Sequence, residues 1–228
     1  MKEKSMHTKI GYYLILLAGV TEFIIGLRYI FSSDPSDQLF GQLSLLEGFF
    51  ALIGLVSIDF FFYGRFKLKP EFRKRPKGFL THFTIILLSL FLIQLLMGFI
   101  PATVREYDKA LAIAFAGPSE ESFFRGVLMG IFIALGKNIP GEYELTIPGK
   151  EPKKLSMFEI IGFGLSSLFF MLLHVNYYNY LNLMLSVFFS GMLLAFAFWY
   201  WEDLTACILA HFTLNIGVVI QSFFMVSF

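Results

Sequence analysis

The sequence predicts an all-α fold, a polytopic bundle of about seven transmembrane helices, and two observations support this prediction. Of the 228 residues, 57% are hydrophobic and only 15% are charged, so the chain is too apolar for a soluble domain with a polar shell. Apolar runs of about 20 residues, the length that crosses roughly 30 Å of hydrocarbon, recur almost without interruption. We therefore expect residues 1–228 to form a single multi-pass membrane domain.

The predicted spans follow one another closely along the chain. The first has a basic start but no convincing small-residue cleavage site, so we expect a retained helix and not a signal peptide. The span at 158–174 is the shortest, which leaves three arrangements open: a tilted helix, an extension toward Tyr178, or an end inside the membrane beside a water-filled cavity. The loop 138–156, with two Pro-Gly turns, predicts a small hairpin. In order, the spans are predicted at 10–31, 40–63, 79–100, 109–135, 158–174, 180–201 and 204–228.

The lysines and arginines predict how the helices are oriented in the bilayer. Basic residues gather before the first span, in the loop 65–77 and in the loop 137–154, and all three segments fall on one side of the predicted bundle. The loops on the other side carry only Arg105 and Lys109. The positive-inside rule then places the N-terminus in the cytoplasm and the C-terminus outside.

Charge and cysteine content exclude two other classes of protein. A net charge of +1 gives no reason to expect a nucleic-acid partner. Cys207 is the single cysteine, so the chain has no intramolecular disulfide framework. The composition itself predicts one partner, the lipid bilayer.

Three charged residues lie in the fourth predicted span, where a charge is energetically unfavourable. A charge near the centre of a bilayer costs roughly 2.5 to 3.5 kcal/mol on insertion scales. Glu121 and Arg125 are four residues apart on one helix face, so they are expected to form a buried ion pair. Glu120 points about 100° away from Glu121 around the helix and needs a different partner or a polar cavity. A lone carboxylate in such a place suits a general base.

Two further spans offer partners for Glu120. His174 lies near the end of the fifth span, and His211 and Asn215 are four residues apart on the seventh. Each of these residues alone is more often a structural hydrogen-bonding group between membrane helices. If they converge, Glu120 and His174 can hold and deprotonate a water molecule, while His211 and Asn215 donate hydrogen bonds to an oxyanion. Together, therefore, they indicate a hydrolase site.

Read in order, these residues form three motifs: Glu-Glu-x-x-x-Arg at 120–125, Phe-x-x-x-His at Phe170 and His174, and His-x-x-x-Asn at 211–215. The set resembles the CAAX protease and bacteriocin-processing family, which includes the CAAX prenyl endopeptidases. The resemblance covers about residues 110–217, and all three motifs occur in the family's order. It implies a catalytic core at 110–217 that acts as an intramembrane endopeptidase on an apolar peptide or membrane protein, including lipidated ones.

The resemblance also implies a role for each motif residue. Glu120 would activate water, His174 would assist, and His211 and Asn215 would form the oxyanion site. Glu121, Arg125 and Phe170 would support the site structurally. Members of the family are often labelled metalloproteases, but no His-Glu-x-x-His motif occurs here. A zinc site would need Glu120, Glu121, His174 and His211 from different helices, so we expect no cofactor, although zinc remains chemically allowed.

Other residues suggest weaker alternatives. Cys207 precedes His211 by four residues, which invites a thiol mechanism, but a lone membrane cysteine is more often a small apolar packing residue. Ser119 and Ser122 lack a Gly-x-Ser-x-Gly context, and Ser119 after Pro118 is expected to ease or cap a break in the helix.

Two other functions remain open from the sequence. Buried glutamates and histidines also build proton relays, so a proton-coupled transporter is one alternative, although no inverted repeat is detectable. A non-catalytic membrane scaffold or immunity protein with a peptidase fold is the other. Glu22, Glu47 and Asp59 in or near the first two spans have no assigned role. Glu22 and Glu47 lie deep enough to bond across helices or to line a cavity.

Overall fold

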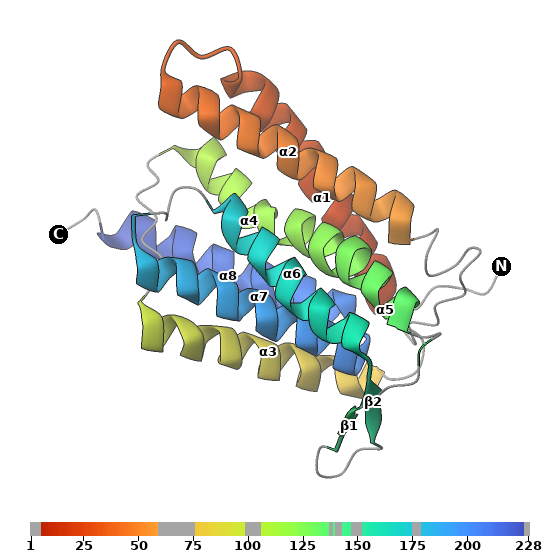
Figure 1. Ribbon diagram of the computed structural model, residues 1–228. Helices are drawn as coiled ribbons and strands as arrows, with labels where there is room; N and C mark the ends of the chain where they lie inside the picture. The colour runs from red at the N-terminus through yellow and green to blue at the C-terminus, as the bar shows by residue number, and fades with distance from the viewer. Residues whose placement is uncertain are drawn as a thin grey trace.

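The computed structural model describes residues 6–58, 76–98, 106–136, 139, 143–146, 152–174 and 179–225, and it is a helical bundle (Figure 1). Three consecutive segments, α4, the π-helix η2 and α5, follow one another without a break, so the described residues form seven helical rods. This confirms the predicted all-α bundle of about seven helices. The rods are α1 (Met6–Tyr29), α2 (Pro35–Ile58), α3 (Pro76–Met97), α4 (Tyr107–Glu121) with η2 (Ser122–Met129) and α5 (Gly130–Gly136), α6 (Met157–Leu173), α7 (Leu181–Trp201) and α8 (Leu204–Met225).

Five of these rods, α1, α2, α3, α7 and α8, are long and apolar enough to cross a membrane. The shorter α6 has 17 residues and rises about 26 Å, less than the roughly 30 Å of hydrocarbon in a bilayer. The predicted span 109–135 falls on the composite rod, which carries the three buried charges of Glu120, Glu121 and Arg125.

The rods are arranged around α4 (Figure 1). The α1–α2 pair packs against α4 on one side of the bundle, while α8 packs against it from the other. Beyond α8 and α7 lies α3, and α6 packs along α7. The start of α1 and the two short strands lie at the same end of the bundle, and the end of α8 lies at the other. Loops 59–75 and 147–151 are outside the described residues, as is Asp59, so the orientation in the bilayer stays a prediction.

A group of polar side chains joins α1, α2 and α4 at one end of the bundle. The Tyr29 hydroxyl oxygen lies 2.6 Å from a carboxylate oxygen of Glu106 and 2.8 Å from one of Asp108, so its one hydrogen is shared between the two carboxylates. The Lys109 ammonium donates to Asp37 at 2.5 Å. Because these bonds connect residues more than 70 positions apart, they hold the α1–α2 pair in place against α4.

Local sequence signals set the start of α6 at the opposite end. Ser156 and Glu159 form a capping box: each side chain bonds to the backbone N–H of the other residue. Glu159 also accepts a 2.8 Å bond from the indole N–H of Trp199 in α7. The predicted hairpin before α6 is confirmed as strands β1 (Tyr143–Leu145) and β2 (Lys153–Leu155), which pair antiparallel. The hairpin and the cap thus fix where α6 enters the bundle.

The sequence suggested a break in the helix near Pro118, but the structure shows no break there. Pro118 lies inside α4, and the rod continues from Ser122 as eight residues of π-helix. Ser119 caps nothing, because its buried hydroxyl has no partner among the described residues. The Ser122 hydroxyl instead donates to the Ser119 carbonyl at 2.7 Å. Proline has no N–H to donate, and π-helical turns accommodate such local misfits, often at functional sites.

Candidate active site

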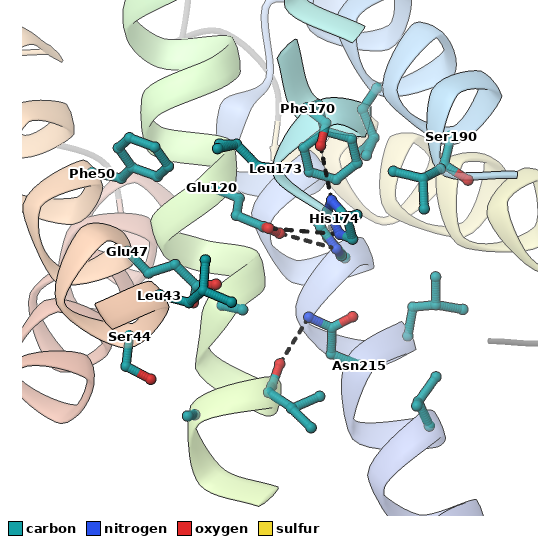
Figure 2. Close-up of a pocket in the computed structure, with 18 of the residues that line it drawn as sticks. Leu43, Ser44, Glu47, Phe50, Glu120, Phe170, Leu173, His174, Ser190 and Asn215 are labelled. Carbon is teal, nitrogen blue, oxygen red and sulfur yellow. Dashed lines mark hydrogen bonds and ion pairs between the residues drawn. The ribbon is translucent and has the colours of Figure 1, made fainter. Parts of the chain in front are cut away.

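The carboxylates and imidazoles of the sequence motifs come together at the centre of the bundle. Glu120 lies in the last turn of α4, His174 directly follows α6, and His211 lies on α8. Gly117, one turn before Glu120, lets α4 approach α8 closely, since a Cβ there would lie 3.1 Å from the Phe212 nitrogen and 3.2 Å from His211. Figure 2 shows the resulting group around one cavity.

The Glu120 carboxylate faces both histidines. One oxygen lies 3.8 Å from Nε2 of His174, and the other lies 3.7 Å from Nε2 of His211. Both distances exceed the 2.7 to about 3.2 Å of a direct N–H···O hydrogen bond. Polar groups at this separation are typically bridged by water, so the three side chains frame a place for one water molecule.

The His174 ring is oriented by its own helix. Its Nδ1 lies 2.8 Å from the Phe170 carbonyl, one turn earlier. A carbonyl oxygen only accepts hydrogen bonds, so Nδ1 of His174 carries the proton and donates it. In the neutral ring Nε2 is then an acceptor, and it is the nitrogen that faces Glu120.

The His211 ring is oriented by Glu121. Its Nδ1 lies 3.0 Å from Glu121 Oε1. Glu121 Oε2 lies 3.2 Å from Arg125 Nε in an ion pair whose atoms are not aligned for a hydrogen bond, and both side chains are 0% exposed. Arg125 also donates from Nη2 to the Gly191 carbonyl at 3.2 Å. The predicted pairing of Glu121 with Arg125 is thus present, and His211 extends it into a buried row of three groups.

Phe170 joins these two parts of the site. Its ring lies 4.8 Å from the His174 ring and 5.8 Å from the His211 ring. The guanidinium carbon of Arg125 lies 4.7 Å from the Phe170 ring centroid, within the range of a cation–π contact. Phe170 therefore limits how far either imidazole can rotate. It supports the site by packing and takes no part in the chemistry.

Asn215 lines the same cavity but is held differently. Its Nδ2 donates a 2.9 Å hydrogen bond to the Ile113 carbonyl of α4 (Figure 2). One hydrogen of the amide is thereby used between helices. An amide nitrogen carries two hydrogens, so the second can still serve a group in the cavity.

The cavity has a volume of about 350 Å³, within the size range of small ligand sites. Its walls are mostly apolar. Four polar residues besides the motif residues also line it, and the sequence pointed to a cavity-lining position only for Glu47, without assigning it to the site. The signal that could have identified them is a polar side chain inside an apolar span, as Gln94 is in α3. The four are Ser44, Glu47, Gln94 and Ser190.

The other side chains considered from the sequence face elsewhere. Cys207 is fully buried, and its sulfur lies 3.9 Å from the Leu194 carbonyl. Ser122 is turned toward backbone carbonyls. Neither Cys207, Ser119 nor Ser122 is among the residues that line the cavity.

The side chains of the site are also candidate ligands for a metal ion. The described residues contain no group of three or more histidine, cysteine, aspartate or glutamate side chains that could hold one. The reason is visible in the geometry, since Glu121 engages the ring nitrogen of His211 opposite to the one that faces Glu120. Of the four side chains that a zinc site would need, Glu121 is therefore not directed at the point that Glu120, His174 and His211 face.

Comparisons with known proteins agree with the motifs. Residues 107–217 match the family model described as type II CAAX prenyl endopeptidase Rce1-like. The curated proteins and the solved structures gave no match. The matched segment contains Glu120, Glu121, Arg125 and both histidines, and five described helices have the length and composition to span a bilayer. Residues 107–217 of this integral membrane protein therefore match the family of type II CAAX prenyl endopeptidase Rce1-like proteins.

Proposed function

We propose that the chain is an intramembrane endopeptidase that hydrolyses an apolar or lipidated peptide with a water molecule activated by Glu120. The observation that carries this proposal is the position of the Glu120 carboxylate, 3.8 and 3.7 Å from the Nε2 atoms of His174 and His211. In each ring the other nitrogen, Nδ1, already has a partner. For His174 this partner is the Phe170 carbonyl, and for His211 it is Glu121.

In the first step, a water molecule donates one hydrogen bond to Glu120 and another to the Nε2 acceptor of His174. Glu120 takes the first proton, and the oxygen forms a bond to the carbonyl carbon of the scissile peptide. The carbonyl π bond opens and its electron pair moves to the oxygen. The product is a tetrahedral intermediate that carries a negative charge.

In the second step, hydrogen bonds stabilise that charge until the intermediate collapses. Asn215 can donate its second amide hydrogen to the oxyanion. His211 can donate from Nε2 only when both ring nitrogens are protonated, because Nδ1 already donates to Glu121. The proton on Glu120 then passes to the amide nitrogen, the C–N bond breaks, and the products are a carboxylic acid and an amine.

The cavity favours an apolar substrate. Leucine, isoleucine, valine and phenylalanine side chains form most of its wall, and polar groups from the motif residues and from four other residues interrupt it. Such a wall binds apolar side chains or a lipid chain without leaving polar groups unpaired. This supports a membrane-derived peptide as the substrate, with or without a lipid.

Replacing Glu120 by glutamine tests the proposal directly. The change removes the proton acceptor and keeps the shape, so cleavage should be abolished while the protein stays folded in detergent. Glu144→Gln, an exposed change on β1, is the matched control and should cleave as the wild type does. Comparing peptide termini in membranes that contain wild-type, Glu120→Gln or Glu144→Gln protein would reveal the substrates. Wild-type turnover by Glu120→Gln on a verified substrate would disprove the glutamate mechanism.

The metal-free form of this mechanism has a separate test. Strong chelators should leave the turnover of the purified protein unchanged, because no proposed step passes through a metal ion. Reversible loss of turnover on chelation, restored by added zinc, would contradict this and would make His174 and His211 ligands.

A further inference from the structure

A second polar group faces the cavity from the α1–α2 pair. Glu47 and Ser44, one turn apart on α2, both line the cavity, and in Figure 2 they lie to the left of Glu120 while His174 lies to its right. Next to them, Glu22 of α1 is 0% exposed, and both of its carboxylate oxygens lack a hydrogen bond among the described residues. The polar groups close enough to influence the Glu22 carboxylate electrostatically are Ser44, Glu47 and Glu120.

No basic side chain among the described residues balances these carboxylates. The charged groups close enough to influence Glu47 are again carboxylates, namely Glu22 and Glu120. Among the described residues, no cation influences Glu22 or Glu47 in this way. Arg125, which is buried, is paired with Glu121. Carboxylates grouped inside a low-dielectric bundle either share protons and stay neutral or ionise when a cation joins them. A basic group on a molecule that enters the cavity would supply such a cation.

We propose that Ser44 and Glu47, backed by Glu22, form a subsite that binds a lysine or arginine side chain of the substrate peptide. This inference rests on the proposed function, because a peptide must already lie in the cavity. A long basic side chain fits the surroundings, since its aliphatic stem packs on apolar walls such as Leu43 and Phe50 while its charged end reaches Glu47. The fixed place of Glu47 on this wall then gives the enzyme a positional preference.

The test uses pairs of peptides that differ by lysine or norleucine at successive positions around the scissile bond. Wild-type protein in liposomes should prefer lysine at one position by roughly 10- to 100-fold in kcat/KM, the value of a hydrogen bond to a charged group. Glu47→Gln should remove this preference, and Glu47→Asp should retain part of it. Glu144→Gln, which changes an exposed glutamate away from the cavity, should keep all of it.

Binding separates this inference from the proposed function. Peptide affinities are measured with Glu120→Gln protein, alone and combined with Glu47→Gln, so that no cleavage is needed. Lysine-dependent binding that disappears with Glu47→Gln, without cleavage by the wild type, would refute the proposed function and keep the subsite.

Three outcomes would overturn the subsite. One is cleavage with no lysine preference at any position. Another is a preference that Glu47→Gln or Glu47→Asp leaves unchanged in folded protein. The third is equal slowing of lysine and norleucine peptides by Glu47→Gln, which would assign Glu47 to proton transfer. Because Glu47→Asp retains the charge, it decides the matter even if Glu47→Gln does not fold.

Discussion

Replacing Arg125 by alanine should strongly destabilise the folded protein. The guanidinium is 0% exposed, pairs with Glu121 at 3.2 Å and donates to the Gly191 carbonyl at 3.2 Å. It also lies 4.7 Å from the Phe170 ring centroid. Breaking a buried ion pair by removing one partner costs about 3 to 5 kcal/mol, because the other charge stays buried without compensation. Here that charge is Glu121, which keeps only His211 as a partner.

Unfolding of purified protein in mixed micelles measures this cost. For a chain of this size, 3 to 5 kcal/mol corresponds to a fall in Tm of roughly 6 to 20 °C. The exposed Lys154→Ala is the control and should change stability by less than about 0.5 kcal/mol. Adding Glu121→Gln to Arg125→Ala should recover part of the loss, with a coupling free energy of about 0.5 to 3 kcal/mol. A loss below about 1 kcal/mol for Arg125→Ala, or no recovery in the double variant, would refute this reasoning.

Three further changes test other parts of the site by turnover of a verified peptide and by thermal unfolding. Asn215→Ala should lower kcat by about 100- to 1000-fold with little change in KM, and should also cost about 1 kcal/mol in stability because its bond to Ile113 is lost; wild-type kcat would remove Asn215 from the oxyanion site. Cys207→Ala should leave kcat close to that of the wild type, and loss of activity would favour the thiol. Gly117→Ala should lower kcat in a folded protein, because the new methyl group would lie 3.1 Å from the α8 backbone; Gly217→Ala, with no atom within 4 Å of its methyl group, should not.

The sequence was sufficient for those features that depend on one helix. The spans follow from apolar runs, and the contact of Glu121 with Arg125 follows from their spacing of four residues. The hairpin before α6 follows from its turns. In each case the atoms that interact are close along the chain, so local periodicity predicts their positions.

Features that depend on two helices were not predictable in the same way. The contact of His211 with Glu121 joins residues 90 positions apart, and only the packing of α8 on α4 decides which ring nitrogen faces which carboxylate. The bond from Asn215 to Ile113 likewise joins residues 102 positions apart. The π-helical turns after Pro118 reflect a choice between hydrogen-bond patterns that composition does not reveal.

The α1–α2 pair has a consequence for how the family can diversify. These helices, within residues 6–58, lie outside the family match at 107–217, yet Leu43, Glu47 and Phe50 from α2 form part of the cavity wall. The groups assigned to bond cleavage and the α2 part of this wall are therefore encoded in separate stretches of the gene. Substitutions or exchange of the first stretch can change which molecules are accepted while the second stays under constant selection for its chemistry.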